Sequence, residues 1–171
     1  MNSEFDQPEF LEVDTNLRLR KYQPDDAQRS LSWYQDIEVV RGVSRPENTE
    51  PFDLVSAVKR FKALREAGEI YVIEINENSI WTAIGDVTLG PKTLPIAVKK
   101  SYWGQGIGKK VIQALFVRTI EMKWQKITLR SVDQSNKRAQ RLYESCGFTK
   151  IGESEDGVFY STTFFTSQIG F

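Results

Sequence analysis

Alternating and periodic apolar positions along the first half of the chain predict strands and helices in succession. Residues 17–22 (LRLRKY) alternate apolar and charged side chains, as in a strand with one buried face. Pro24 and the acidic residues after it predict the start of a helix that ends near Gly42. Pro51 and Gly68 bound a second predicted helix, whose apolar stripe at helical spacing consists of Leu54, Ala57, Val58, Phe61 and Leu64.

The rest of the chain predicts more strands, separated by two further helices. Runs of β-branched and aromatic residues predict strands at 69–76, 81–89, 94–100, 126–132, 149–152 and 158–165. Helical periodicity predicts helices at 108–124 and 136–146, and Gly147 stands where a helix C-cap glycine belongs. This order indicates an α/β fold with a mixed, mostly antiparallel sheet and helices on both faces.

The beginning of the chain differs in composition from the rest. Residues 1–17 contain five acidic side chains and no Lys or Arg. This bias indicates a solvated acidic tail over residues 1–16, although Phe5, Phe10, Leu11 and Val13 leave room for part of it to dock. No repeat or linker follows, so residues 17–171 are expected to form one domain.

Composition excludes several kinds of chemistry and location. The chain has no histidine, which removes Ser-His-Asp and Cys-His triads and the usual zinc sites, so no metal is expected. Cys146 is the single cysteine and cannot form an internal disulfide. Zero net charge argues against nucleic acid as a partner. No apolar run is long enough for a membrane span, and the polar start is unlike a signal peptide, so a cytoplasmic protein is expected.

One segment in the middle of the chain lacks acidic residues. Residues 87–120 contain no Asp or Glu, whereas they carry six cations: Lys92, Lys99, Lys100, Lys109, Lys110 and Arg118. A local positive field of this kind is consistent with an anionic ligand nearby. Chance together with solvated lysines is the other interpretation, and the charges alone do not separate the two.

Three alternating glycines lie within this segment, just before a predicted helix. Residues 102–109 read YWGQGIGK, and glycine permits positive φ and close approach of a ligand to the backbone. The free N–H groups at a helix start then form a cup suited to a phosphate or pyrophosphate. A tight turn that merely uses glycine is the alternative. The spacing fits neither a Walker A loop nor a dinucleotide fingerprint.

Two motifs in this order resemble the GNAT superfamily of N-acetyltransferases. Residues 102–109 resemble its [Q/R]-x-x-G-x-[G/A] motif, and residues 136–148 (NKRAQRLYESCGF) resemble N-x-x-A-x-x-L-Y-E-x-x-G-F. Trp103 departs from the first motif, since Gln or Arg is usual there. Tryptophan at that place resembles the branch of ribosomal-protein N-terminal and small-amine acetyltransferases.

The resemblance implies a fold and a cofactor site. It implies that the strands at 94–100 and 126–132 form a parallel, splayed pair and that acetyl-CoA, a cosubstrate, lies between them. Backbone groups of Ile96, Ala97 and Val98 would then pair with the pantetheine arm, and one N–H would hold the thioester oxygen. By the same resemblance, the pyrophosphate would lie on Gly104, Gln105, Gly106, Ile107, Gly108 and Lys109, and Asn136 would contact the pantetheine.

The resemblance also implies catalytic roles. Tyr143, which by periodicity alone is a core residue, matches the tyrosine that protonates the leaving thiolate. The position at which some relatives carry a glutamate base is Ser131 here, which leaves Asp86, Asp133 and Glu74 as carboxylates, with Asp86 the expected base. Cys146 is expected to be a small buried residue.

Several functional questions stay open on the sequence. The expected activity is direct acetyl transfer to a primary amine, either a small molecule or a protein N-terminus. A non-catalytic acyl-CoA-binding module and a nucleotide- or nucleic-acid-binding domain are the alternatives. The acceptor would be selected by residues 27–68 and the last hairpin. The chain is expected to be a monomer or homodimer, with a possible docking edge at Phe164, Phe165 and residues 169–171.

Overall fold

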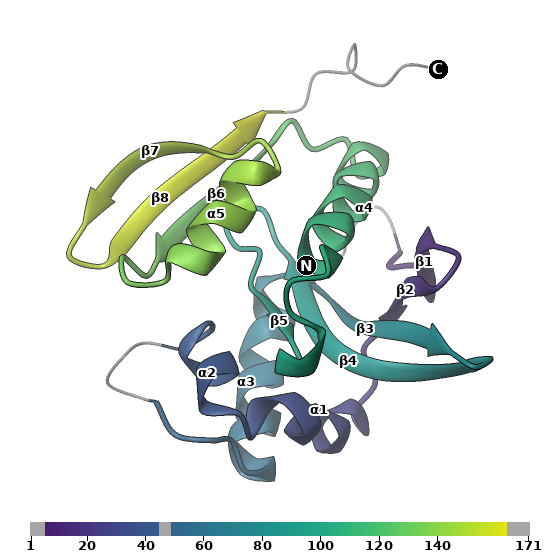
Figure 1. Cartoon of the computed structure of the whole chain (residues 1–171). Coiled ribbons are helices and arrows are strands. Elements are labelled where there is room, and N and C mark those ends of the chain that lie inside the picture. Colours follow the sequence, from purple (N-terminus) through teal and green to yellow (C-terminus); the bar gives the residue numbers. More distant parts are fainter. Residues whose placement is uncertain (1–5, 45–48, 164–171) are drawn as a thin grey trace.

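The strands of the chain form two antiparallel sheets that lie side by side (Figure 1). A computed structural model describes residues 6–44 and 49–163. The five-stranded sheet has the order β1-β2-β3-β4-β5, and the three-stranded sheet has the order β6-β8-β7. The first comprises Phe10–Asp14 (β1), Leu17–Lys21 (β2), Glu69–Glu77 (β3), Ile80–Leu89 (β4) and Ile96–Val98 (β5). The second comprises Lys126–Val132 (β6), Thr149–Ser154 (β7) and Gly157–Thr163 (β8).

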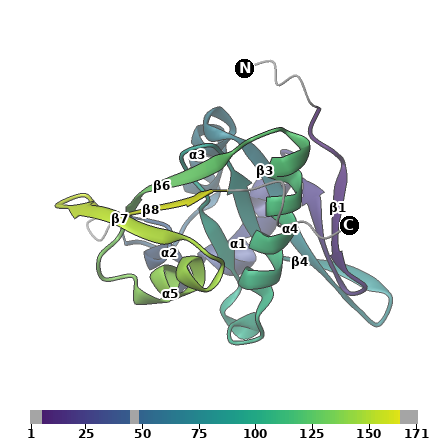
Figure 2. The ribbon, with the colours of Figure 1, turned by 90° about the horizontal axis from the view of Figure 1, so that it is seen from above.

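The helices cover both faces of the five-stranded sheet. They are Asp26–Tyr34 (α1), Ile37–Arg41 (α2), Leu54–Ala67 (α3), Ile107–Glu121 (α4) and Lys137–Ser145 (α5), with a 3-10 turn at Lys100–Tyr102 (η2). Figure 2 shows α1 and α3 on one side of β3 and β4 and α4 on the other, whereas α5 lies beside the three-stranded sheet. In the part of the chain that the structure describes, no helix is long and apolar enough to cross a membrane.

Two hydrophobic cores result from the alternation of side chains along the strands. Ile70 and Ala97 point into the core made with α1, α2 and α3. Their neighbours Tyr71 and Val98 point into the larger core, which contains α4 and the inner face of the three-stranded sheet. Because one core reaches both sheets, α4 holds them in a fixed relation to one another.

The expected α/β fold, with its antiparallel pairing and helices on both faces, is confirmed, with three differences in detail. The strands divide into two sheets, because β5 and β6 are edge strands of different sheets. Residues 10–14, expected in an acidic tail, form β1, because Leu11 and Val13 pack against the larger core. The first predicted helix divides into α1 and α2 where the Asp36 side chain accepts a hydrogen bond from Glu38 N. The suggested docking edge at residues 164–171 lies outside the described residues.

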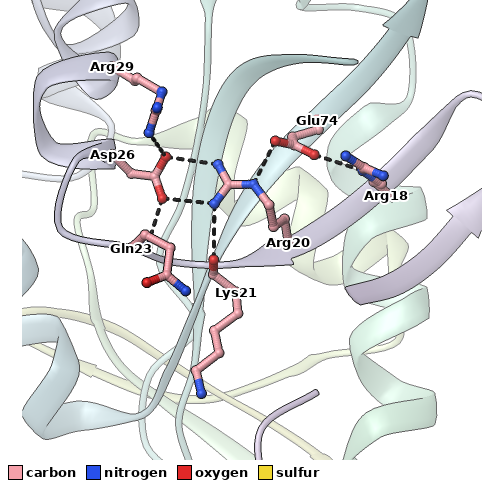
Figure 3. A network of polar contacts seen from close by, with 7 residues as sticks. All are labelled: Arg18, Arg20, Lys21, Gln23, Asp26, Arg29 and Glu74. Carbon is pink, nitrogen blue, oxygen red and sulfur yellow. Dashed lines mark hydrogen bonds and ion pairs between the residues drawn. The ribbon is translucent and has the colours of Figure 1, made fainter. Parts of the chain in front are cut away.

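A chain of buried ion pairs fixes β2 to β3 and to the start of α1 (Figure 3). The Arg20 guanidinium donates to both carboxylate oxygens of Asp26, at 2.8 and 3.0 Å, and to Glu74 at 2.7 Å. Arg18 donates to the other oxygen of Glu74 at 2.7 Å. Burial alone would raise the pKa of Asp26, but the hydrogen bonds from Arg20 and from Gln23 N hold it below its usual value.

Removal of Arg20 should therefore destabilise the fold. We expect Arg20→Ala to lower the free energy of unfolding by about 3–5 kcal/mol, because Asp26 and Glu74 would stay buried without their shared cation. The pKa of Asp26 is lowered in the folded state, so its contribution is present above the unfolded value of about 3.9 and is lost as pH falls through the folded value. Urea titrations of wild type and variant between pH 3 and 7 measure both effects.

Arg29→Ala is the matched control for this experiment. Arg29 also donates to Asp26, at 3.0 Å, but its side chain is 54% exposed. Its loss should change stability by no more than about 1 kcal/mol. Equal effects of the two substitutions would contradict the assignment of Arg20 as the central cation.

Candidate active site

The two sheets part between β5 and β6, and a cavity of about 700 Å³ opens there. At one end Thr128 N donates to Pro91 O at 3.1 Å, which joins β6 to the segment between β4 and β5. Toward the other end β6 is irregular at Ser131, whose φ is +61°. Gly157 of β8 lies against this irregularity, since a Cβ atom there would come within 2.5 Å of Val132 O.

The glycine segment forms one wall of the cavity and leads into α4. Gly104 and Gly106 have φ of +76° and +75°, and a Cβ atom on either would meet no protein atom within 4 Å. Among the described residues no side chain caps α4, so its first N–H groups are available to a ligand. Gly108 has another role: a Cβ atom would lie 3.1 Å from a methyl group of Leu142, so this glycine permits close packing of α4 on α5.

Tyr143 of α5 lines the cavity, and its hydroxyl lies next to the segment just before β5. Its side chain is 6% exposed, and its hydroxyl donates to Leu94 O at 2.8 Å. The ring packs edge-on against Phe148, with 5.6 Å between centroids. Burial raises the pKa of Tyr143 well above its usual value. The phenol is thus a fixed, protonated donor in the wall of the cavity.

Asn136 connects two walls of the cavity. Its Oδ1 accepts from Ala139 N at 3.1 Å and so caps α5. Its Nδ2 donates to Gly42 O at 3.1 Å, just beyond the end of α2. Asn136 therefore links the helix that carries Tyr143 to the segment after α2.

The structure brings most of the sequence-predicted site residues together. Lining the cavity are Ile96, Ala97, Val98, Gly104, Gly106, Ile107, Gly108, Lys109, Asn136 and Tyr143. Gln105 does not line it. Within residues 6–44 and 49–163, no three His, Cys, Asp or Glu side chains are arranged to hold a metal ion.

Asp86 lies apart from these residues. It is 1% exposed and faces α1, where its carboxylate accepts from Trp33 Nε1 at 2.8 Å. Burial raises its pKa, and Arg60, Tyr34 and Trp33 act in the opposite direction. Its expected role as the base is not supported by this placement, because the side chain points into the core under α1 and α3 rather than into the cavity.

The other two carboxylates differ from each other. Glu74 is held by Arg18 and Arg20, away from the cavity. Asp133 lines the cavity just after β6, and one of its oxygens accepts from both the N–H and the hydroxyl of Ser135. Of the three carboxylates that the sequence offered, Asp133 is therefore the one at the site.

Two parts of the cavity wall differ in how far the sequence predicted them. The segment from Glu38 to Ser44 falls within residues 27–68, which were expected to select the acceptor, whereas Arg138, which lies beside Trp103, was not predicted as a site residue. Arg138 stands inside the second motif, so its position near Asn136 was a signal that was available. Which part of residues 27–68 reaches the cavity depends on long-range packing, which the local sequence pattern does not show.

Comparisons with known proteins agree with this geometry. The family profile described as an acetyltransferase (GNAT) domain matches residues 66–150. Among solved structures, a domain from Methanocaldococcus jannaschii DSM 2661 has a TM-score of 0.76 at 19% identity, covering 88% of this chain and 100% of that chain. No curated protein matches the sequence.

Two further structures are similar in fold and contain coenzyme A. RimL, a ribosomal L7/L12 alpha-N-protein acetyltransferase in complex with coenzyme A, has a TM-score of 0.71 at 14% identity, covering 91% of this chain and 98% of that chain. AAC(6')-Ib, in complex with ribostamycin and coenzyme A, has a TM-score of 0.70 at 21% identity, with 86% and 93% covered.

The glycine loop before α4, the parted strands and the family match define an acetyl-transferring enzyme. The chain belongs to the GNAT superfamily. Within it, the chain is an N-acetyltransferase.

Asp86 should contribute to stability. We expect Asp86→Ala to lower the free energy of unfolding by about 1–3 kcal/mol, because the buried Trp33 Nε1 would lose its acceptor. Urea denaturation measures the change. Glu155→Ala removes an exposed carboxylate in the turn before β8 and should stay within about 0.5 kcal/mol of wild type. Unchanged stability of Asp86→Ala would show that the carboxylate does not hold the core.

Proposed function

We propose that this enzyme transfers the acetyl group of acetyl-CoA directly to a primary amine. The observation that carries the proposal is one cavity lined by the glycine loop, the edge of β5 and Tyr143. Residues 104–109 would receive the pyrophosphate, because unpaired N–H groups and the positive end of the α4 dipole favour an anion there. The coenzyme A complexes of RimL and AAC(6')-Ib, which share the fold, support this choice of donor.

The pantetheine arm would pair with the free edge of β5. Lys99 N donates to Ile84 O and Thr88 N donates to Pro95 O, so Pro95 and Lys99 direct their backbone groups toward β4. Because direction alternates along an antiparallel strand, Ile96 and Val98 direct theirs away from β4, toward the cavity. Val98 O is occupied by Trp103 Nε1 at 2.7 Å, whereas Val98 N–H is left to hold the oxygen of the thioester as charge develops on it.

Tyr143 would act as the general acid. Attack by the amine expels the thiolate of CoA, which needs a proton or a strong hydrogen bond. The raised pKa of Tyr143 keeps its hydroxyl protonated throughout the range in which the amine can react. Phe148 fixes the orientation of the ring. The hydroxyl, which donates its single proton to Leu94 O in this structure, would turn about its C–O bond to give that proton to the thiolate.

Asp133 would accept the proton of the amine, directly or through one water. It lines the cavity, and its second oxygen has no partner among the described residues. The acceptor would enter beside residues 38–44, which form the wall facing α5. A protein N-terminus and a small amine both fit this chemistry. A non-catalytic acyl-CoA-binding module would keep the loop but show no turnover.

The donor site is tested by thermal unfolding with acetyl-CoA, CoA, ATP and NAD. A ligand at 100 times its Kd adds about 2.7 kcal/mol, which is roughly 5–10 °C for a chain of this size. We expect this shift with acetyl-CoA and CoA alone. Gly106→Asp should abolish it, because a carboxylate would then face the pyrophosphate.

Gly147→Asp is the matched control, because Gly147 has a φ of +92°, lies outside the cavity and also has open space around its Cβ position. It carries the same charge and a similar backbone strain, so it should keep the shift. An equal shift with ATP, or a normal shift in Gly106→Asp, would contradict the placement of the pyrophosphate.

The two catalytic roles differ in how they should depend on pH. Tyr143→Phe should lower kcat about 10²- to 10⁴-fold at every pH between 6 and 9 and leave the Kd of acetyl-CoA little changed. Asp133→Asn should also lower kcat, but its rate should recover as pH rises, because solvent then removes the proton from the amine. Steady-state assays with a panel of amines measure both. Wild-type turnover in Tyr143→Phe would exclude the acid role.

A further inference from the structure

Arg138 stacks on Trp103 at the edge of the cofactor cavity. The Cζ atom of Arg138 lies 3.4 Å from the centroid of the Trp103 ring. Both residues line the cavity, together with Gly104, which follows Trp103 directly. Trp103 is also the position at which the glycine motif departs from the family pattern, so its role needs its own explanation.

Trp103 is held firmly in place. Its Nε1 donates to Val98 O at 2.7 Å, and its ring packs against both hydrophobic cores. A fixed ring of this kind orients the guanidinium stacked on it, because the planar cation is attracted to the aromatic face. The edge of the guanidinium, which carries the N–H donors, stays free to form hydrogen bonds.

Arg138 has no anionic partner among the described residues, and within them its guanidinium contacts the face of the Trp103 ring. Desolvation alone acts on its pKa, which is lowered. Lys100 is paired with Glu38 and Lys110 with Asp14, whereas Lys109, which also lines the cavity, has no ion-pair partner among the described residues either. Arg138 is therefore a positioned cation with free donors in the wall of a cavity.

We propose that Arg138 binds the pyrophosphate of acetyl-CoA and that Trp103 is its positioning residue. The inference rests on the proposed function, since it names a further contact to the same cofactor. The planar fork of the guanidinium matches two phosphate oxygens, and the stack on Trp103 leaves this fork exposed. The loop at 104–108 supplies backbone donors, and Arg138 supplies the full positive charge that those donors lack.

A ligand series tests the proposal by calorimetry on the full chain. CoA, dephospho-CoA and pantetheine share the arm but differ in phosphates: dephospho-CoA lacks only the 3′-phosphate, and pantetheine has none. We expect Arg138→Gln to weaken CoA and dephospho-CoA about ten- to hundredfold and to leave pantetheine unchanged. Arg141→Gln is the control, because Arg141 is an exposed arginine of α5 outside the cavity, and its removal should change all three by less than threefold.

Each other outcome overturns the proposal. A loss confined to CoA would place Arg138 on the 3′-phosphate. An equal loss of affinity for pantetheine would indicate a structural role of Arg138. Unchanged affinity for all three ligands would show that Arg138 does not contact the cofactor. Failure of wild type to bind CoA at all would instead refute the proposed function, and so the two failures can be told apart.

Trp103 is tested by its coupling to Arg138. Trp103→Leu should weaken CoA in the wild-type background but have at least threefold less effect when Arg138 is already Gln. Trp103→Phe keeps an aromatic face and should retain part of the affinity despite the loss of the hydrogen bond to Val98 O. Melting temperatures confirm that each variant is folded. Full additivity of the two substitutions would overturn the positioning role.

Discussion

The separation of β5 from β6 is the constraint on which the site depends. If β5 and β6 paired with each other, the cavity would close. The N–H and C=O groups on their facing edges would then form hydrogen bonds between the strands. Here a hydrogen bond from Thr128 N to Pro91 O joins β6 to the segment before β5 at one end. At the other end the backbone of β6 is irregular at Ser131, and Gly157 of β8 packs against it. A ligand strand can therefore enter where a protein strand is missing.

This arrangement explains how relatives with little sequence identity share the fold. The features that shape the cavity are backbone directions, a few glycines and one core under α4, and many sequences satisfy them. The M. jannaschii domain, at 19% identity, is matched over 88% of this chain. Side chains that line the cavity, such as Arg138 and Asp133, are not among the features that shape it.

Local signals in the sequence were sufficient for much of the site. Glycines at alternate positions before a helix predicted the loop at 104–108. Asn136 and Tyr143 were expected at the site through the resemblance of residues 136–148 to the GNAT motif, since periodicity alone made Tyr143 a core residue. The pattern of glycines could not separate two uses of glycine. Gly106 is required by its positive φ, whereas Gly108 is required because α5 packs closely against it.

Features that depend on contacts between residues far apart in the sequence could not be predicted from local sequence patterns. The burial of Asp86 results from α1 folding back over β4, so that Trp33 meets a strand more than fifty residues away in the sequence. The docking of β1 depends on whether burial of Leu11 and Val13 stabilises the strand more than the neighbouring acidic residues favour solvent. The stack of Arg138 on Trp103 joins two motifs that are separate in the chain, and neither motif predicts it alone.

The acidic character of the N-terminal segment has a consequence for self-association. β1 is the outer strand of its sheet, and an outer strand offers unpaired N–H and C=O groups to any second copy. Glu9, Glu12 and Asp14 are exposed on or next to this strand, and within residues 6–44 and 49–163 only Asp14 of the three forms an ion pair, with Lys110. Two copies approaching edge to edge would bring like charges together, which opposes the growth of a continuous intermolecular sheet. The acidic residues that predicted a solvated tail thus oppose aggregation at the β1 edge of the sheet. The cavity lies at the opposite edge, along β5.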